Sequence, residues 1–137
     1  VAAAIADGGQ IMKPHVMAQV RDRNGNVVRT YQPSLWKQAV GADVASTMRD
    51  AMVQVAQQGT ATLLQVPGVT TAGKTGTAQL GNGTSHAWII GFAPAEAPRV
   101  AIAVIVEAQP GASEQTGGHV AAPIGRAVLE AALAVVR

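Results

Sequence analysis

The sequence predicts a single α/β (α+β) unit over residues 1–137, in which helices flank an antiparallel sheet. Three strand-like segments follow one another, Thr70–Gln79, His86–Ala93 and Arg99–Glu107. The links between them, Leu80–Ser85 and Pro94–Pro98, are short, and short links join antiparallel neighbours. Helical patterns precede and follow these strands, so we expect helices on the faces of the sheet.

The N-terminal part predicts a helix end and a hairpin. Val1–Asp7 is typical of the last turns of a helix, which the two following glycines stop. Asn24-Gly25 is a strong hairpin signal, and it predicts two short strands at Pro14–Arg21 and Val27–Tyr31. The stretch Pro33–Gly41 shows no regular pattern.

Two longer helices are predicted. Asp43 is the expected N-cap of a helix that ends near Gln58, where Gly59 terminates it. Its predicted apolar face consists of Val44, Met48, Ala51, Met52 and Val55. The last helix is predicted to begin near Val120, after a glycine-rich loop at Ala108–Gly118. Its apolar residues at helical spacing are Ile124, Val128, Leu129, Leu133 and Val136.

One predicted strand implies a second layer of structure. Val100–Val106 is apolar at every position, which is typical of a strand covered on both faces. We therefore expect it in the middle of the sheet. The final helix can cover one face, and we expect polypeptide upstream of Val1 to cover the other.

Composition narrows the class of protein. Only 13% of the residues are charged, against about a quarter in typical domains. We therefore expect the chain to bury more surface than it can cover by itself. It contains no cysteine, so disulfides and thiolate metal sites are excluded. A net charge of +2 is too small to indicate nucleic-acid binding.

The segment Lys74-Thr75-Gly76-Thr77 carries the strongest chemical signal. It places one cation, two hydroxyls and a glycine side by side, which suits the binding of a carboxylate. Thr75 and Thr77 should point to the same face of a strand, since residues two apart point alike. Gly76 should allow the backbone of a substrate to approach closely, as an added strand would.

The same segment also fits a nucleotide-binding pattern. Residues Gly68 to Thr75 match G-x-x-x-x-G-K-[ST] letter for letter. That loop needs a helix after Thr75 to receive phosphate. The glycines and threonine that follow disfavour a helix, and Gly81-Asn82-Gly83 predicts a turn. A strand leading into a hairpin is the favoured interpretation, and a nucleotide-binding module remains the remote alternative.

Several motifs together resemble a known family. Lys74-Thr75-Gly76 matches the third motif of penicillin-binding proteins and serine β-lactamases. Further matches are Gly59-Thr60-Ala61, Gly73–Gln79, His86–Pro94 and Ala121-Ala122-Pro123. Essentially the whole chain resembles the C-terminal part of the transpeptidase domain of class B penicillin-binding proteins. The likeness is greatest to the elongation and division transpeptidases.

The resemblance implies a serine D,D-transpeptidase that cross-links the stem peptides of peptidoglycan and is acylated by β-lactams. The substrate ends in D-alanine, and its carboxylate would be bound by Lys74, Thr75, Gly76 and Thr77. The Thr77 N–H would be one oxyanion-hole donor. No metal or organic cofactor is implied. A β-lactamase or D,D-carboxypeptidase relative and a non-catalytic β-lactam sensor are the alternatives.

The same resemblance implies a partner. The family's Ser-x-x-Lys and Ser-x-Asn motifs are expected on the upstream half of the same domain. We therefore predict that this chain has no lysine-activated serine and is inactive alone. The membrane anchor is also expected upstream, with the domain on the extracytoplasmic, cell-wall face of the bacterial plasma membrane.

The remaining candidates are weaker. His15, His86 and His119 lie far apart and show no metal-ligand spacing. For His86 we predict a structural or rim role, and for His119 either the rim of the site or the start of a helix. Trp88 and Phe92 lie on one face of a strand and are predicted to be core.

Overall fold

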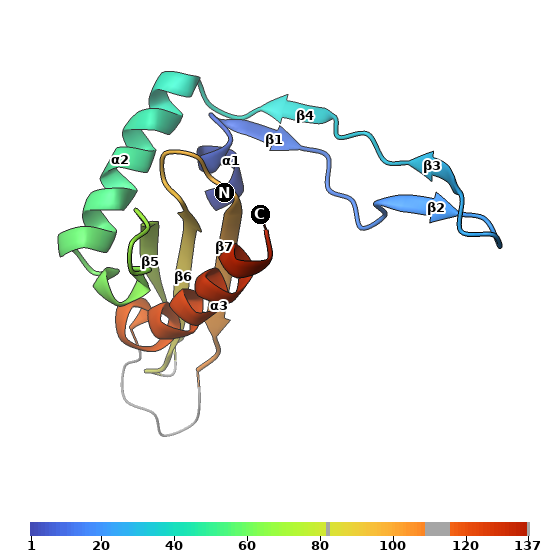
Figure 1. The fold of residues 1–137 in the computed structure, drawn as a ribbon. Helices are drawn as coiled ribbons and strands as arrows, with labels where there is room; N and C mark the ends of the chain where they lie inside the picture. The colour runs from blue at the N-terminus through green and yellow to red at the C-terminus, as the bar shows by residue number, and fades with distance from the viewer. Residues whose placement is uncertain (82, 109–115, 137) are drawn as a thin grey trace.

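The computed structural model describes residues 1–81, 83–108 and 116–136. Its body is built on an antiparallel sheet in the order β5 (Ala72–Gln79), β6 (Ser85–Ala93) and β7 (Val100–Val106) (Figure 1). This arrangement confirms the predicted fold class. Each strand begins and ends within two residues of its predicted bounds, because strong turn signals separate the three segments.

The two faces of the sheet carry separate cores. One face packs against α1 (Ala2–Ala6) and α2 (Ala42–Gln58), and its cluster contains Ala2, Met52, Ala72, Phe92 and Ala95. The other face packs against two short helices and α3 (Ala122–Val135). The short helices are η1 (Thr62–Leu64) and η2 (Gly117–Ala121). Leu64, Ile89 and Leu129 are fully buried in this second core.

Helix α2 has the predicted length but a different buried face. Its N-cap is Gly41, so the prediction of Asp43 as the N-cap was wrong. Asp43 lies in the first turn instead, where a carboxylate interacts favourably with the helix dipole. The buried residues are Ala45, Met52 and Ala56, whereas Val44 and Met48 are exposed. Met52 is buried as predicted and Val55 packs against the second core, so the predicted face was wrong for Val44, Met48 and Ala51.

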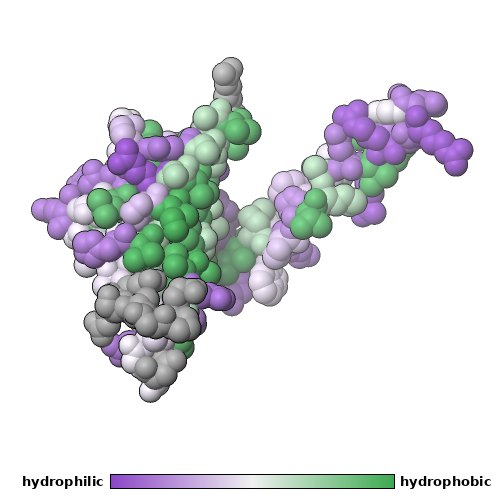
Figure 2. Space-filling model, turned by 90° about the horizontal axis from the view of Figure 1, so that it is seen from below, coloured by the Kyte–Doolittle hydropathy of each residue, from purple (hydrophilic) through white to green (hydrophobic). Residues whose placement is uncertain are grey.

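The C-terminal helical segment starts earlier than predicted. Gly117 and Gly118, predicted as loop, form the first turn of η2, which leads into α3. Residues 109–115 of the predicted loop lie outside the described part of the chain. Leu129 is buried as predicted, but Ile124 and Val128 are 46% and 45% exposed. Figure 2 shows a band of apolar residues on the face of the molecule seen from below.

By length and composition, the stretch Gly117–Val135 could also span a membrane. Length and composition are weak evidence here, because the core helices of soluble proteins pass the same test. Ala121, Ala122 and Leu129 of this stretch are fully buried in the core of the domain. We therefore describe it as a helix that covers the sheet.

The position of strand β7 in the sheet differs from the predicted one. Among the described strands it pairs only with β6, so the prediction that it lies in the middle of the sheet was wrong. Its burial alternates along the strand: Val100, Ile102 and Val104 are partly buried, whereas Ala103 and Ile105 are exposed. The apolar composition of a strand indicates that both of its faces can be buried. It does not indicate which elements bury them.

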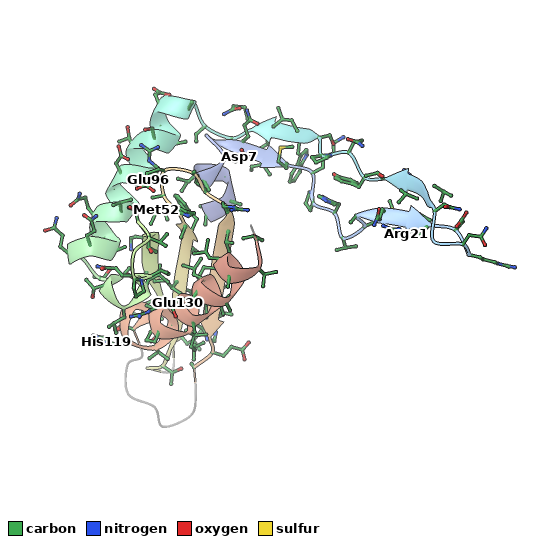
Figure 3. The ribbon with its side chains drawn as sticks, in the orientation of Figure 1. Asp7, Arg21, Met52, Glu96, His119 and Glu130 are labelled. Carbon is green, nitrogen blue, oxygen red and sulfur yellow. The ribbon has the colours of Figure 1, made fainter. Side chains whose placement is uncertain are left out.

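Residues between α1 and α2 form an extended arm that projects from the body (Figure 1, Figure 3). At its tip, β2 (Gln19–Arg21) and β3 (Val27–Thr30) form the predicted hairpin. The first strand is shorter than predicted, because it begins at Gln19 and not at Pro14. Nearer the body, β1 (Gln10–Met12) pairs with β4 (Leu35–Gln38). This second ribbon was not predicted. Its strands are short and largely exposed, so they lack an alternating apolar pattern.

Candidate functional site

The segment Lys74–Thr77 lies in β5, at the edge of the described sheet. β5 pairs with β6 on one side and with no described strand on the other. Alternate backbone N–H and C=O groups of an edge strand point away from the sheet and are free to bind another chain. The motif therefore lies where a substrate could add as a further strand, as we expected for Gly76.

The same strand argues against a phosphate-binding loop. β5 continues in extended conformation from Ala72 through Gln79. A phosphate-binding loop needs a helix N-terminus directly after its lysine and threonine, because that terminus supplies the N–H donors. Thr75 is followed by four more strand residues instead. The nucleotide-binding interpretation therefore lacks its structural basis.

Thr75 and Thr77 line one cavity, of about 500 Å³. The cavity lies where the end of α2, η1 and the start of η2 meet the edge of the sheet. Its remaining lining residues are Gly59, Thr60, Thr62, Leu63, Thr116, Gly117, Gly118 and His119. Five of the ten lining residues are threonines, and none of the ten is acidic. Such a surface offers hydrogen-bond donors to an anion without a competing negative charge.

Thr60 approaches the motif from the end of α2. Its Oγ1 lies 2.7 Å from Oγ1 of Thr75, and either hydroxyl could be the donor. A β-carbon at Gly118 would overlap the carbonyl oxygen of Thr60. The absence of a side chain at Gly118 therefore brings η2 against the residue that contacts Thr75.

Lys74 is exposed, and its Nζ donates to the backbone carbonyl of Thr75 at 2.6 Å. Lys74 lies opposite Ile90 of β6 and Thr75 lies opposite Ile89. Because side chains alternate along a strand, the lysine and the threonines point to opposite faces of the sheet. The shared face predicted for Thr75 and Thr77 is confirmed, since both line the cavity.

Gly76 lies opposite Trp88, on the same face as Lys74. A β-carbon at Gly76 would come within 3.3 Å of the Trp88 β-carbon, so any larger residue would crowd the tryptophan. Trp88 is 38% exposed, so the prediction that it belongs to the core was wrong, whereas Phe92 is buried as predicted. Along β6 only the end that contains Phe92 is covered by α1 and α2.

The histidines have separate surroundings. Nδ1 of His86 accepts the backbone N–H of Ala108 at 2.9 Å, which is a structural role as predicted. His119 lies in η2 (Figure 3). It lines the same cavity as Thr75. It therefore combines the predicted rim position with a place near the start of a helix. His15 stacks on Tyr31 in the arm, with ring centroids 3.5 Å apart.

Comparison with known protein families identifies the domain to which the sheet, the motif on β5 and the cavity belong. Residues 1–130 match the penicillin binding protein transpeptidase domain. The chain belongs to this family. The matched residues include both cores of the sheet, the motif on β5 and all of the lining of the cavity.

Relatives of known sequence support the assignment. The chain is 44% identical to the peptidoglycan D,D-transpeptidase PbpA of Mycobacterium tuberculosis H37Rv, over 97% of this chain and 28% of the relative. It is 43% identical to PbpA of Mycolicibacterium smegmatis, with the same two shares. The chain therefore spans less than a third of the length of these relatives.

Solved structures agree with the fold. Penicillin-binding protein A of M. tuberculosis, as a ceftriaxone acyl-enzyme complex, matches with a TM-score of 0.85 and 42% identity, over 96% of this chain and 30% of that one. A D,D-transpeptidase domain from Eggerthella lenta matches with a TM-score of 0.86 and 37% identity, over 98% of this chain and 30% of that one.

One expectation about the motifs of this family was wrong. The chain does contain a Ser-x-x-Lys sequence, Ser34-Leu35-Trp36-Lys37, although we expected that motif only upstream. Its lysine lies in β4 of the exposed arm, and its serine directly precedes that strand. Residues three apart are neighbours on a helix but point to opposite faces of a strand. Lys37 is therefore not placed to activate Ser34, and both lie on the arm, away from β5 (Figure 1).

Proposed function

We propose that this chain forms the substrate-binding wall of a serine D,D-transpeptidase that cross-links peptidoglycan stem peptides. The observation that carries the proposal is the position of Lys74–Thr77 on a sheet edge that pairs with no further described strand, with Thr75 and Thr77 facing a cavity lined by five threonines. Relatives of this chain are D,D-transpeptidases by name, and one is seen as an acyl-enzyme.

The substrate in this proposal is a peptide that ends in D-alanine. Its backbone adds to the free edge of β5 as a further strand, and Gly76 leaves room for it. The Thr75 and Thr77 hydroxyls donate to the terminal carboxylate from one side of the strand. Lys74 supplies positive charge from the other side. A β-lactam carboxylate would be held by the same groups.

The covalent step needs a serine that we place on upstream polypeptide of the same domain. The serine oxygen attacks the penultimate D-alanine carbonyl, the terminal D-alanine leaves, and an amine of another stem takes the acyl group. The Thr77 N–H is proposed as one of the donors to the oxyanion. Loss of one such donor typically slows an acyl transfer by roughly 10²–10³.

The proposal includes location and partners. The upstream half of the domain carries the Ser-x-x-Lys and Ser-x-Asn motifs and covers the exposed side of Trp88 and Ile105. It also carries the membrane anchor, which holds the domain on the cell-wall side of the plasma membrane. By itself, this chain has no activity.

Product analysis tests the type of reaction. The protein with its upstream segment is given a D-Ala-D-Ala stem peptide and an acceptor amine. We expect the transferred product to exceed the hydrolysed one. Hydrolysis without transfer would assign the protein to the carboxypeptidases or β-lactamases. Stable acylation by penicillin without turnover of the peptide would assign it to β-lactam sensors.

A further inference from the structure

We infer that Thr60 is a positioning residue that orients the Thr75 hydroxyl towards a ligand carboxylate. This inference rests on the function proposed above. The two side-chain oxygens are 2.7 Å apart, the usual length of a hydrogen bond between hydroxyls. Both residues line the same cavity. Thr60 can therefore act on the ligand through Thr75, whether or not it touches the ligand.

The direction of this hydrogen bond decides what Thr75 offers to a ligand. Each hydroxyl has a single proton, so one threonine donates and the other accepts. If Thr75 donated to Thr60, only its lone pairs would face the cavity, and they would repel a carboxylate. If Thr60 donates, the Thr75 proton is free. A carboxylate only accepts hydrogen bonds, so it selects the second arrangement.

The resulting chain of donors runs from Thr60 to Thr75 to the carboxylate. Hydrogen bonds in such a chain polarise one another, so the first strengthens the second. Without the Thr60 hydroxyl, the Thr75 oxygen loses a donor and the Thr75 proton is free to turn away from the ligand. The loss should therefore reach the bound carboxylate through Thr75, and it does not require a direct contact with Thr60.

The backbone holds Thr60 in place for this role. The N–H groups of Gly59 and Ala61 both donate to the Val55 carbonyl oxygen at 3.1 Å, which fixes the chain on either side of Thr60. Ala61 is fully buried. Gly118 lies against the Thr60 carbonyl, where a β-carbon would overlap it. The position of the Thr60 β-carbon is thus fixed by its backbone.

The test uses the protein with its upstream nucleophile and measures the rate of acylation by benzylpenicillin. We expect Thr60→Val to slow acylation roughly three- to tenfold, the range typical of one hydrogen bond. Thr60→Ser should restore most of the rate, because serine keeps the hydroxyl. Thr60→Val should cause little further loss in a Thr75→Val background, because it acts through Thr75.

A role in packing alone would give equal losses in both backgrounds and no rescue by serine, and that result would overturn the inference. Thr60→Ala replaces Thr60→Val in the same comparison if the valine variant does not fold. Its outcomes are judged by the same criteria.

A second measurement separates this inference from the proposed function. Binding of N-acetyl-D-alanyl-D-alanine and of its C-terminal amide is followed by NMR in the same variants. We expect the wild type to prefer the acid and Thr60→Val to lose most of that preference. A preserved preference in Thr60→Val would show the inference to be wrong. If the wild type prefers the acid, Thr60→Val loses that preference and neither protein is acylated, the proposed catalysis fails while the role of Thr60 stands.

Discussion

Lys74 and Thr75 are adjacent in β5, yet they lie on opposite faces of the sheet, Lys74 opposite Ile90 and Thr75 opposite Ile89. Ile90 packs with the core beneath α2, whereas Ile89 belongs to the core beneath α3. A ligand on the free edge of β5 would therefore meet a cation from one face and hydroxyls from the other. Neither face alone supplies both groups.

The lysine can be tested against a second lysine of the same chain. In the protein with its upstream segment, Lys74→Ala should slow acylation by penicillin at least tenfold, because a charge-assisted interaction with the carboxylate is lost. Lys37→Ala is the matched control, since Lys37 belongs to the Ser-x-x-Lys sequence on the arm. We expect its rate to equal that of the wild type. Equal losses in the two variants would contradict the proposed site.

Thr77 tests the contribution of a hydroxyl apart from the backbone. Thr77→Val keeps the shape of the side chain and the N–H but removes the hydroxyl. We expect acylation to slow by roughly tenfold or more, as for a hydrogen bond to a charged group. Thr30→Val, on the exposed strand β3, serves as control. An unchanged rate in Thr77→Val would show that this hydroxyl does not bind the ligand.

A substitution at Gly117 tests the close packing of η2 against the sheet. A β-carbon there would overlap the Trp88 carbonyl oxygen and come within 2.9 Å of the Gly76 carbonyl oxygen. Gly117→Ala should therefore push η2 away from the sheet and lower the free energy of unfolding by roughly 1–3 kcal/mol. At Gly81 a β-carbon would meet nothing within 4 Å. Gly81→Ala should leave the thermal midpoint unchanged, and a similar drop in both variants would refute the close approach.

The turn of the arm should respond to acid. Hydrogen bonds from the side chain and the backbone N–H of Asn26 lower the pKa of Asp22 below its ordinary value of 3.8. The folded turn therefore favours the ionised carboxylate. Its stabilisation is complete above the unfolded pKa and is lost as the pH falls through the folded pKa.

An NMR titration of the Asn24 and Asn26 amides measures this pKa. The Asn24 and Asn26 N–H groups both donate to Asp22, so their shifts should follow its ionisation. We expect a midpoint below 3.8. In Asn26→Ala the midpoint should rise, because the side-chain donor is gone. A wild-type midpoint at or above the ordinary value would contradict the hydrogen bonding of the turn.

The sequence predicted the parts of the fold that depend on local signals. The three strands, the Asn24-Gly25 hairpin and the end of α2 at Gly59 follow from turn residues and helix stops. Sheet order could not be predicted in the same way. The position of β7 depends on which strands are available to pair with it, and the composition of Val100–Val106 carries no information on that.

The site was predicted only where a motif marked it. Thr75 and Thr77 were found because they follow Lys74 in a known pattern, and both line the cavity. The hydrogen bond between Thr60 and Thr75 spans 15 residues, and no local pattern predicts such a contact. The Ser34–Lys37 sequence matches a motif but does not form the corresponding site. A serine and a lysine three residues apart are neighbours in a helix, whereas here they lie in or beside a strand.

We propose that this chain binds the substrate but does not carry the nucleophile. The most direct test incubates labelled penicillin with the 137-residue chain alone and with the protein that includes its upstream segment, followed by intact-mass measurement and peptide mapping. We predict no adduct on the chain alone, and one adduct on an upstream serine in the longer protein. A covalent penicillin adduct on any residue of this chain, Ser34 included, would contradict the account.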